Sequence, residues 1–295
     1  MKLLAITASI GAMVLASSYS SAAAVSSPTI ERDLHYTDRG HAYIGVDLND
    51  ELGYPMILDT AANVGVLPNQ LKQELDLSGD QLISREVQGA AGKTILEMAR
   101  LDNTAVADLS YSGLTYVFQD LNSLELETGQ LPGIVGHNFM SRHCVAFDFT
   151  SSRLAMNPGE CDEALTQGLR ESRFILDRNF IKLTTYFNGE EVDALLDTGA
   201  PESYINSPLH AITGQQIVDT DEAKGLNDQS VEKGKIESLN YRLGEHDIEE
   251  PFAYVSDMPV FAALGYGDKP VLVLGLDIFK QNKLVIDYAN NRIYF

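Results

Sequence analysis

The sequence predicts a mainly β protein built from two β-barrel-like lobes. Short segments rich in β-branched and aromatic residues recur between Gly, Asn, Asp and Pro, which is typical of strands. Helical periodicity is weak, and two distant parts of the chain repeat each other. With 295 residues, 44% of them hydrophobic, the chain is long enough for two modest domains with real cores.

The expected strands are spread over both halves of the chain. In order they are AYIGVDL (42–48), YPMILDT (54–60), LTYVFQDL (114–121), FIKLTTYF (180–187), EVDALLDT (191–198), PFAYVSD (251–257), KLVIDYA (283–289) and NRIYF (291–295). Helical periodicity is clearest in residues 69–77, and another short helix is expected near residues 277–281. Many short strands with few helices favour β-barrel-like lobes.

The N-terminus has the pattern of a secretory signal peptide. Lys2 precedes an apolar run from Leu3 to about Ala16, and small residues then lead to Ala24. The run is shorter than the roughly 20 residues of a membrane-spanning helix, which makes an uncleaved anchor the less favoured alternative. We therefore expect residues 1–24 to be a signal peptide, and the protein to be periplasmic or secreted without a stable membrane anchor.

Export makes Cys144 and Cys161 candidates for a disulfide. They flank two predicted short strands about a Thr-Ser-Ser turn, so closing this loop is geometrically plausible. A metal site is less favoured, because neither cysteine has a C-x-x-C partner or a nearby histidine pair at ligand spacing.

The charge balance and the missing motifs exclude several classes of function. The formal net charge of -21, from 42 acidic and 21 basic residues, argues against nucleic acid or an anionic membrane as partner. The sequence has no P-loop, G-x-S-x-G elbow or H-E-x-x-H motif. No metal and no cofactor are therefore expected.

The internal repeat is the most informative feature of the sequence. MILDTAANVGVLP aligns with ALLDTGAPESYIN, which places Asp59 and Asp197 138 residues apart. Further on, Gly136 and Gly275 align at a separation of 139, and each precedes another aspartate by 12 residues. A constant offset at both ends predicts two related folding units.

The repeat also sets the expected domain boundaries. We place an N-terminal lobe at residues 25–160, a linker at 161–170 and a C-terminal lobe at 171–295. The linker region contains Pro, Gly and charged residues, with room for a short helix between Asp162 and Leu169. The later aspartates, Asp148 and Asp287, are expected to accept backbone N–H bonds beside hairpins rather than to act in catalysis.

An Asp-Thr-Gly turn after an apolar strand, with a second copy in the chain, resembles the aspartic peptidases. The segments IVG (134–136) and VLG (273–275) match that family's apolar strand beside the catalytic turn, and Gly136 and Gly275 take its structural glycine positions. The tail from residue 274 to 295 is similar to the retropepsin-like branch. The resemblance covers most of residues 42–295 and implies two acid-protease-like lobes with the active site between them, forming a monomeric pseudo-dimer.

The resemblance implies that Asp59 and Asp197 are the catalytic pair. Hydrolysis of a peptide bond without a metal or a covalent intermediate needs one group to deprotonate water and another to protonate the carbonyl oxygen. Two adjacent carboxyls cannot both ionise, so one keeps a proton and the pair supplies acid and base together. The proton belongs to the pair, and neither residue is assigned a separate role.

The residues after each aspartate are expected to support the turns. By resemblance, Thr60 and Thr198 join the two turns through hydroxyl-to-backbone hydrogen bonds, and Gly199 allows a tight turn with its N–H directed at the carboxylate. The first turn has Ala61 where the family has glycine. Either this turn has an ordinary φ, or the site is distorted.

Two glycine-containing loops resemble flaps that close over substrate. They are VQGAAGKT (87–94) and KGLNDQS (224–230), with Gly89 lying 30 residues after Asp59 and Gly225 lying 28 after Asp197. The predicted flap residues are Gly89, Ala90, Gly92, Gly225 and Leu226. Closure of such loops excludes water and positions the scissile bond.

The leading hypothesis is an exported aspartic endopeptidase that acts on peptides or proteins. The alternative is a catalytically impaired peptide-binding protein on the same fold, in which Ala61 marks the decay of the site. A third hypothesis, an acidic structural module, is disfavoured because an aspartate is present at both turns.

Overall fold

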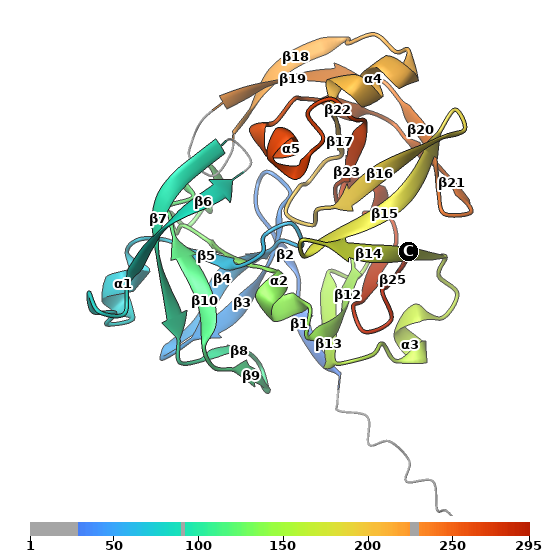
Figure 1. Ribbon diagram of the computed structural model, residues 1–295. Helices are drawn as coiled ribbons and strands as arrows, with labels where there is room; N and C mark the ends of the chain where they lie inside the picture. The colour runs from blue at the N-terminus through green and yellow to red at the C-terminus, as the bar shows by residue number, and fades with distance from the viewer. Residues whose placement is uncertain (1–28, 90–91, 225–229) are drawn as a thin grey trace, which may run out of the picture.

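The computed structural model describes residues 29–89, 92–224 and 230–295. The predicted signal peptide, residues 1–24, lies outside this part of the chain, as do the flap residues Ala90, Gly225 and Leu226. The described residues form a mainly β structure with one 10-stranded and one 15-stranded sheet (Figure 1). Within them, no helix is long and apolar enough to cross a membrane.

The 10-stranded sheet belongs to the first half of the chain and lies on the left of Figure 1. Its strand order is β6-β7-β10-β5-β11-β4-β3-β8-β9, with β2 paired to β3. The strands are β2 (His35–Tyr36), β3 (Ala42–Leu48), β4 (Glu51–Leu58), β5 (Gly65–Leu67), β6 (Ile83–Gly89), β7 (Gly92–Leu101), β8 (Thr104–Val106), β9 (Leu109–Tyr111), β10 (Leu114–Phe118) and β11 (Gly133–Val135).

The second half repeats this arrangement in the order β15-β16-β23-β17-β22-β19-β18, with β20 and β21 beside β15. These strands are β15 (Phe180–Phe187), β16 (Glu190–Leu196), β17 (Tyr204–Ile205), β18 (Asp219–Lys224), β19 (Ser230–Ile236), β20 (Leu239–Leu243), β21 (His246–Glu250), β22 (Ala253–Val255) and β23 (Val271–Leu274). Two β-rich lobes are therefore confirmed. The barrel-like lobes are not closed, because each run of strands ends in an open hairpin edge, β6 in one lobe and β18 in the other.

A shared layer of strands joins the two halves in the order β1-β13-β12-β24-β25-β14. These strands are β1 (Ile30–Asp33), β12 (His143–Asp148), β13 (Arg153–Pro158), β14 (Glu171–Asp177), β24 (Lys283–Asp287) and β25 (Arg292–Tyr294). At its centre β12 and β24 are antiparallel, with Cys144 opposite Asp287 and Asp148 opposite Lys283. This pairing connects the lobes through main-chain hydrogen bonds.

Helices are short and lie between the strands. They are α1 (Leu71–Glu74), α2 (His137–Met140), α3 (Glu163–Thr166), α4 (Ser207–Thr213) and α5 (Pro259–Leu264), with 3-10 turns η1 (Asn122–Leu124) and η2 (Asp277–Phe279). The helix expected over 69–77 is one turn long, and Asp76 adopts a left-handed φ of 51° just beyond it. The longest, α4, has a clear start and stop: Asn206 accepts a hydrogen bond from the Leu209 N–H, and Gly214 is left-handed.

The hydrophobic core is continuous from one lobe to the other. Val145 and Phe147 of β12 and Leu284 and Ile286 of β24 are fully buried and belong to the same apolar cluster. Asp148 accepts the Thr150 N–H at 3.1 Å and Asp287 accepts the Asn290 N–H at 3.0 Å, which confirms their expected role beside hairpins.

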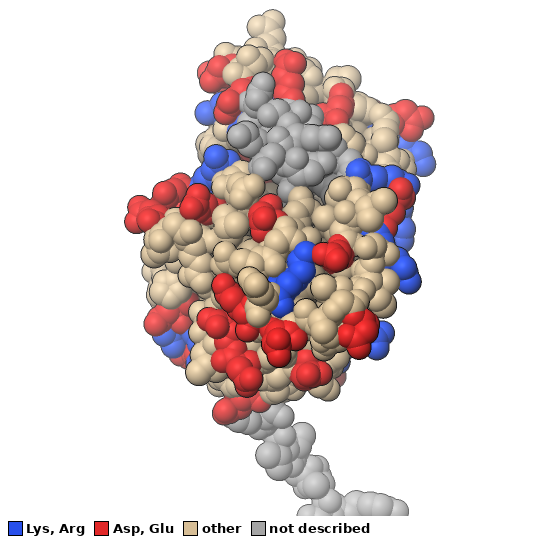
Figure 2. Space-filling model, turned by 90° about the vertical axis from the view of Figure 1, so that its left-hand side faces the viewer, with Lys and Arg blue, Asp and Glu red and all other residues tan. Residues whose placement is uncertain are grey.

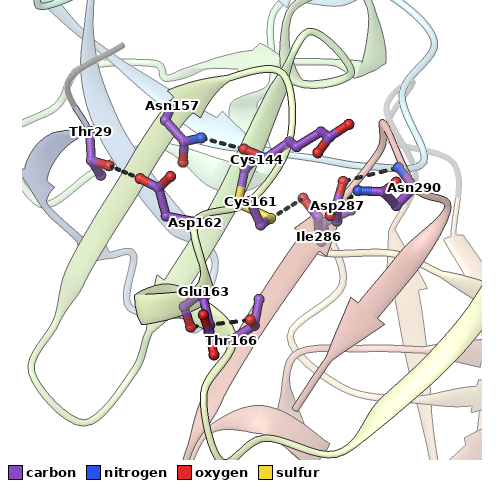
Figure 3. The surroundings of a disulfide bond; sticks show 11 residues. Thr29, Cys144, Asn157, Cys161, Asp162, Glu163, Thr166, Ile286, Asp287 and Asn290 are labelled. Carbon is purple, nitrogen blue, oxygen red and sulfur yellow. Dashed lines mark hydrogen bonds between the residues drawn. A yellow bond between two sulfur atoms is a disulfide. The ribbon is translucent and has the colours of Figure 1, made fainter. Parts of the chain in front are cut away.

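The linker is fastened to this shared layer at its start. Cys144 and Cys161 form a disulfide with a Cα–Cα distance of 4.9 Å, and Figure 3 shows it beside Ile286 and Asp287 of β24. The Asp162 carboxylate accepts a hydrogen bond of 3.2 Å from the Thr29 hydroxyl. The chain is thus fixed where it passes from the first lobe to the second.

The acidic composition shows on the surface. Figure 2 presents the β6–β7 side of the molecule, where Asp and Glu side chains gather over the lower half of the face. With a net charge of -21, long-range electrostatics favours cationic over anionic ligands.

Candidate active site

The two repeated aspartates lie at the ends of equivalent strands. Asp59 follows β4 and Asp197 follows β16. Each of these strands runs parallel to its neighbour, β11 or β23. The Asp59 N–H donates to the Val135 carbonyl at 3.0 Å, and the Asp197 N–H donates to the Leu274 carbonyl at 2.9 Å. Sheet hydrogen bonds therefore position both aspartates.

The glycine after each neighbouring strand is required by a close approach of main chains. A Cβ on Gly136 would lie 2.6 Å from the Ala62 carbonyl oxygen. A Cβ on Gly275 would lie 2.4 Å from the carbonyl carbon of Glu202. Real Cβ atoms do not make contacts this short. Only glycine at these two positions therefore lets each segment pass so close to the aspartate turn.

The two turns are locked to each other by threonines. Thr60 donates its hydroxyl proton to the Leu196 carbonyl at 2.8 Å and accepts the Thr198 N–H at 3.0 Å. Thr198 does the same in the opposite direction, donating to the Leu58 carbonyl at 2.8 Å and accepting the Thr60 N–H at 3.1 Å. Both side chains are buried, so these four bonds form in a low-dielectric setting.

This arrangement brings the two carboxyls together. Asp59 accepts the N–H groups of Ala61 and Ala62 at 2.8 and 3.0 Å, and Asp197 accepts that of Gly199 at 2.9 Å. The Asp59 carboxyl lies against the second turn, because a Cβ on Gly199 would lie 2.5 Å from its Cγ. Two carboxyls held this close do not both ionise readily, so the arrangement favours one proton shared by the pair.

The surroundings favour retention of this proton. Burial raises the pKa of both Asp59 and Asp197, and the negative charge of Asp59 raises the pKa of Asp197 further. The backbone N–H bonds act in the opposite direction, because they stabilise the ionised form. Both residues remain partly accessible to solvent.

Ala61 does not distort the first turn. Its φ lies outside the left-handed region, and its N–H still reaches the Asp59 carboxylate. Gly199 does not have a left-handed φ either, contrary to the expectation that glycine is needed there to turn the chain. The reason for glycine is space, because a Cβ at 199 would lie 2.5 Å from Cγ of Asp59.

The predicted flap loops join the strands of two hairpins. In the first, β6 pairs with β7 up to Gly89 opposite Gly92. In the second, β18 pairs with β19 up to Lys224 opposite Ser230. Helix α5 of the second lobe lies against β6 of the first, so the first hairpin reaches across to the other lobe (Figure 1).

A buried acidic network behind the second turn was not found from the sequence. Asp277 accepts the N–H and the hydroxyl of Ser203 at 3.0 and 2.9 Å. In the same lobe, Glu250 is buried and accepts the Tyr241 hydroxyl at 2.6 Å. Burial, with the Asp277 charge, raises the pKa of Glu250 to about 8. The available signal was the difference between the two copies, Asp277 against Asn138 in the first.

Comparison with known proteins agrees with this geometry. Residues 44–139 match the aspartyl protease family, and the matched segment includes Asp59, Ala61 and the β6–β7 hairpin. This confirms the resemblance to retropepsin-like aspartic peptidases, and it does so in the lobe that departs from the Asp-Thr-Gly motif. No curated protein matches the chain.

Proposed function

We propose that the protein is an exported aspartic endopeptidase that hydrolyses peptide bonds with a water activated between Asp59 and Asp197. The observation that carries this proposal is the close placement of the two aspartate turns, which Thr60 and Thr198 hold together through four hydrogen bonds. The aspartyl protease match of residues 44–139 supports the same class of enzyme.

The reaction follows from the single shared proton. The ionised carboxyl takes a proton from water while the water oxygen attacks the carbonyl carbon of the peptide bond. The protonated carboxyl gives its proton to the oxygen of that carbonyl. The resulting tetrahedral diol then loses a hydroxyl proton to a carboxylate as the C–N bond breaks. The leaving nitrogen is protonated from the same pair, which returns the pair to its one-proton state.

The substrate is an extended peptide held between the lobes. Such a segment binds by adding a strand to exposed sheet edges, with its side chains directed alternately into the two walls. The hairpins β6–β7 and β18–β19 stand at the open end of the strand order in each lobe, and their outer strands β6 and β18 supply such edges.

Export and the pH range are part of the proposal. The Cys144–Cys161 disulfide suits an oxidising compartment. Because the pKa of each aspartate is raised, the one-proton form persists to higher pH than for isolated carboxyls. Activity is expected to fall as pH rises through the upper pKa of the pair.

The impaired-binder alternative gains no support from Ala61, because that residue keeps an ordinary φ and its hydrogen bond to Asp59. The deciding experiment is hydrolysis of a mixed peptide library by the mature protein between acidic and neutral pH. Asp59→Asn and Asp197→Asn should each lower kcat/KM by about 10²-fold or more. The exposed Asp247→Asn is the matched control. Full activity in either dyad variant would overturn the proposal.

A further inference from the structure

The walls of the two lobes beside the aspartates differ in chemistry, and the repeat allows a position-by-position comparison. Val64 and Glu202 each lie five residues after an aspartate, and Val66 and Tyr204 each lie seven after. Strand pairing extends the match, because Val66 lies opposite Val117 as Tyr204 lies opposite Tyr254.

The next strand continues the pattern. Val117 lies opposite Met98 of β7, and Tyr254 lies opposite Lys235 of β19. Two residues nearer the hairpin ends, Leu96 corresponds to Lys233.

The first-lobe wall is apolar throughout. Val66 and Val117 are buried, and the partly buried Ala62, next to the first turn, packs on the same cluster. The remaining first-lobe positions of the comparison, Val64, Leu96 and Met98, are also partly buried against this cluster. A wall of this kind takes an apolar side chain.

The second-lobe wall is polar and charged. Lys233 has a side chain 13% exposed, and its ammonium lies 3.9 Å from the centre of the Tyr254 ring and 3.7 Å from the Asp221 carboxylate. The positive charge of Lys233 is therefore already engaged by two neighbours.

Glu202 is the unengaged group of this wall. In the described part of the chain its carboxylate receives no hydrogen bond. It lies near the second turn, because its main chain passes so close to Gly275 that a Cβ there would lie 2.4 Å from the Glu202 carbonyl carbon. The charged groups that act on Glu202 are the cations Lys280 and Lys233 and the anion Asp277, which has the same sign as Glu202. Burial raises the pKa of Glu202, so a donor from the substrate would replace lost hydration.

We propose that the cleft selects peptides with an apolar side chain toward the first lobe and a hydrogen-bond-donating, basic side chain toward Glu202 of the second lobe. The proposal rests on the proposed peptidase function and adds the class of substrate. A site whose polar group must be satisfied rejects an analogue that lacks the donor more strongly than an apolar site rejects a size change.

The test uses pairs of peptides that are identical except for lysine or norleucine at one position flanking the scissile bond. Norleucine has the same aliphatic chain without the ammonium group. At the position that faces the second lobe, wild-type enzyme should prefer lysine by about tenfold or more in kcat/KM. At the position that faces the first lobe, it should prefer norleucine.

Two variants assign the preference to Glu202. Glu202→Val installs the residue found at the matching first-lobe position, and should abolish or reverse the lysine preference, measured as the ratio of kcat/KM for the lysine and norleucine peptides. Glu202→Gln keeps the shape and a hydrogen-bond acceptor and should retain part of the preference. Val64→Glu should create a lysine preference on the first-lobe side.

The outcomes separate this inference from the proposed function. Hydrolysis with equal rates for lysine and norleucine, a preference for glutamate, or a lysine preference unchanged in Glu202→Val would each overturn the inference and leave the peptidase intact. Absence of hydrolysis with every peptide would overturn the peptidase. In that case the same peptide pairs with a reduced, non-cleavable bond measure the discrimination in binding, and equal affinities would overturn the inference.

Discussion

The two aspartate turns reach the same geometry with different support. Behind the first turn, Gly65 makes room for the Tyr116 ring, since a Cβ there would lie 2.2 Å from that ring, and Asn138 donates to the Thr115 carbonyl at 2.9 Å. Behind the second, the equivalent of Gly65 is Ser203, which is held by Asp277. The two turns share the reciprocal hydrogen bonds of Thr60 and Thr198 and the backbone N–H bonds to each carboxylate.

The turns also differ in how much space each leaves for a side chain. Ala61 fits in the first turn, whereas a Cβ on Gly199 would overlap the Asp59 carboxyl. The first turn therefore tolerates a methyl group that the second cannot. The two halves therefore differ at a position where their surroundings are not equivalent.

The largest expected effect comes from adding a methyl group to the second turn. Gly199→Ala should lower kcat/KM by between about 10²- and 10⁴-fold, because the new Cβ must displace the Asp59 carboxyl, one of the two proton-transfer groups. Ala61→Gly should stay within about threefold of wild type, since the first turn already has its N–H bonds. Peptide hydrolysis measures both. Similar effects of the two substitutions would show that the turns are equivalent after all.

The next effect concerns Glu250 and its network behind the second turn. A folded-state pKa of about 8, above the ordinary 4.5, stabilises the fold fully below pH 4.5, and this stabilisation is lost as pH rises through 8. Glu250→Gln, which resembles the protonated acid, should remove this loss, on the order of a few kcal/mol. Urea unfolding at pH 5, 7 and 9 measures it.

The exposed neighbour Glu249→Gln is the control for this series and should follow the wild type at each pH. If wild type and Glu250→Gln lose stability in parallel between pH 5 and 9, the carboxyl of Glu250 is ionised in the folded protein and the prediction is wrong.

The smallest effect tests the feature that the turns share. Thr60→Val and Thr198→Val should each lower the free energy of unfolding by about 1–3 kcal/mol, because each leaves a buried carbonyl and a buried N–H of the opposite turn unpaired. Thr184→Val, at an exposed position on β15, should change it by less than about 0.5 kcal/mol. If the losses in unfolding free energy for Thr60→Val and Thr198→Val differ several-fold, the reciprocal hydrogen bonds of the two threonines do not contribute equally.

Sequence patterns predicted the parts of the fold that repeat. The constant offset located both aspartate turns, and the residue pattern gave β3 and β15 with their bounds as observed. The helix over 69–77 was overestimated because the chain turns at Asp76, whose left-handed φ of 51° cannot continue a helix. Whether the sheets close into barrels was not predictable, because edge pairing depends on contacts that no local pattern records.

The parts of the candidate site that belong to a local sequence motif were predictable, and the parts that depend on spatial neighbours were not. Asp-Thr-Gly and its copy are local signals, so the turn residues were found. Glu250 is a single acid in an ordinary strand, and its significance depends on its burial, on Tyr241 of the neighbouring strand and on the charge of Asp277. Glu202 differs from Val64 in the aligned copies, yet without strand pairing nothing placed that difference in a wall of the cleft.

The crowding at Gly199 has a consequence for the symmetry of the site: two identical halves that both carry alanine could not form it. A homodimer of two first halves would place an alanine where Gly199 stands, with its Cβ 2.5 Å from the partner's catalytic carboxyl. Such a dimer could not assemble the pair of aspartates in this geometry. A single chain with two unlike halves is free of that constraint, since alanine can stand in one turn while glycine stands in the other. The change at position 61 is thus compatible only with unlike halves, and covalent linkage guarantees that unlike halves always meet.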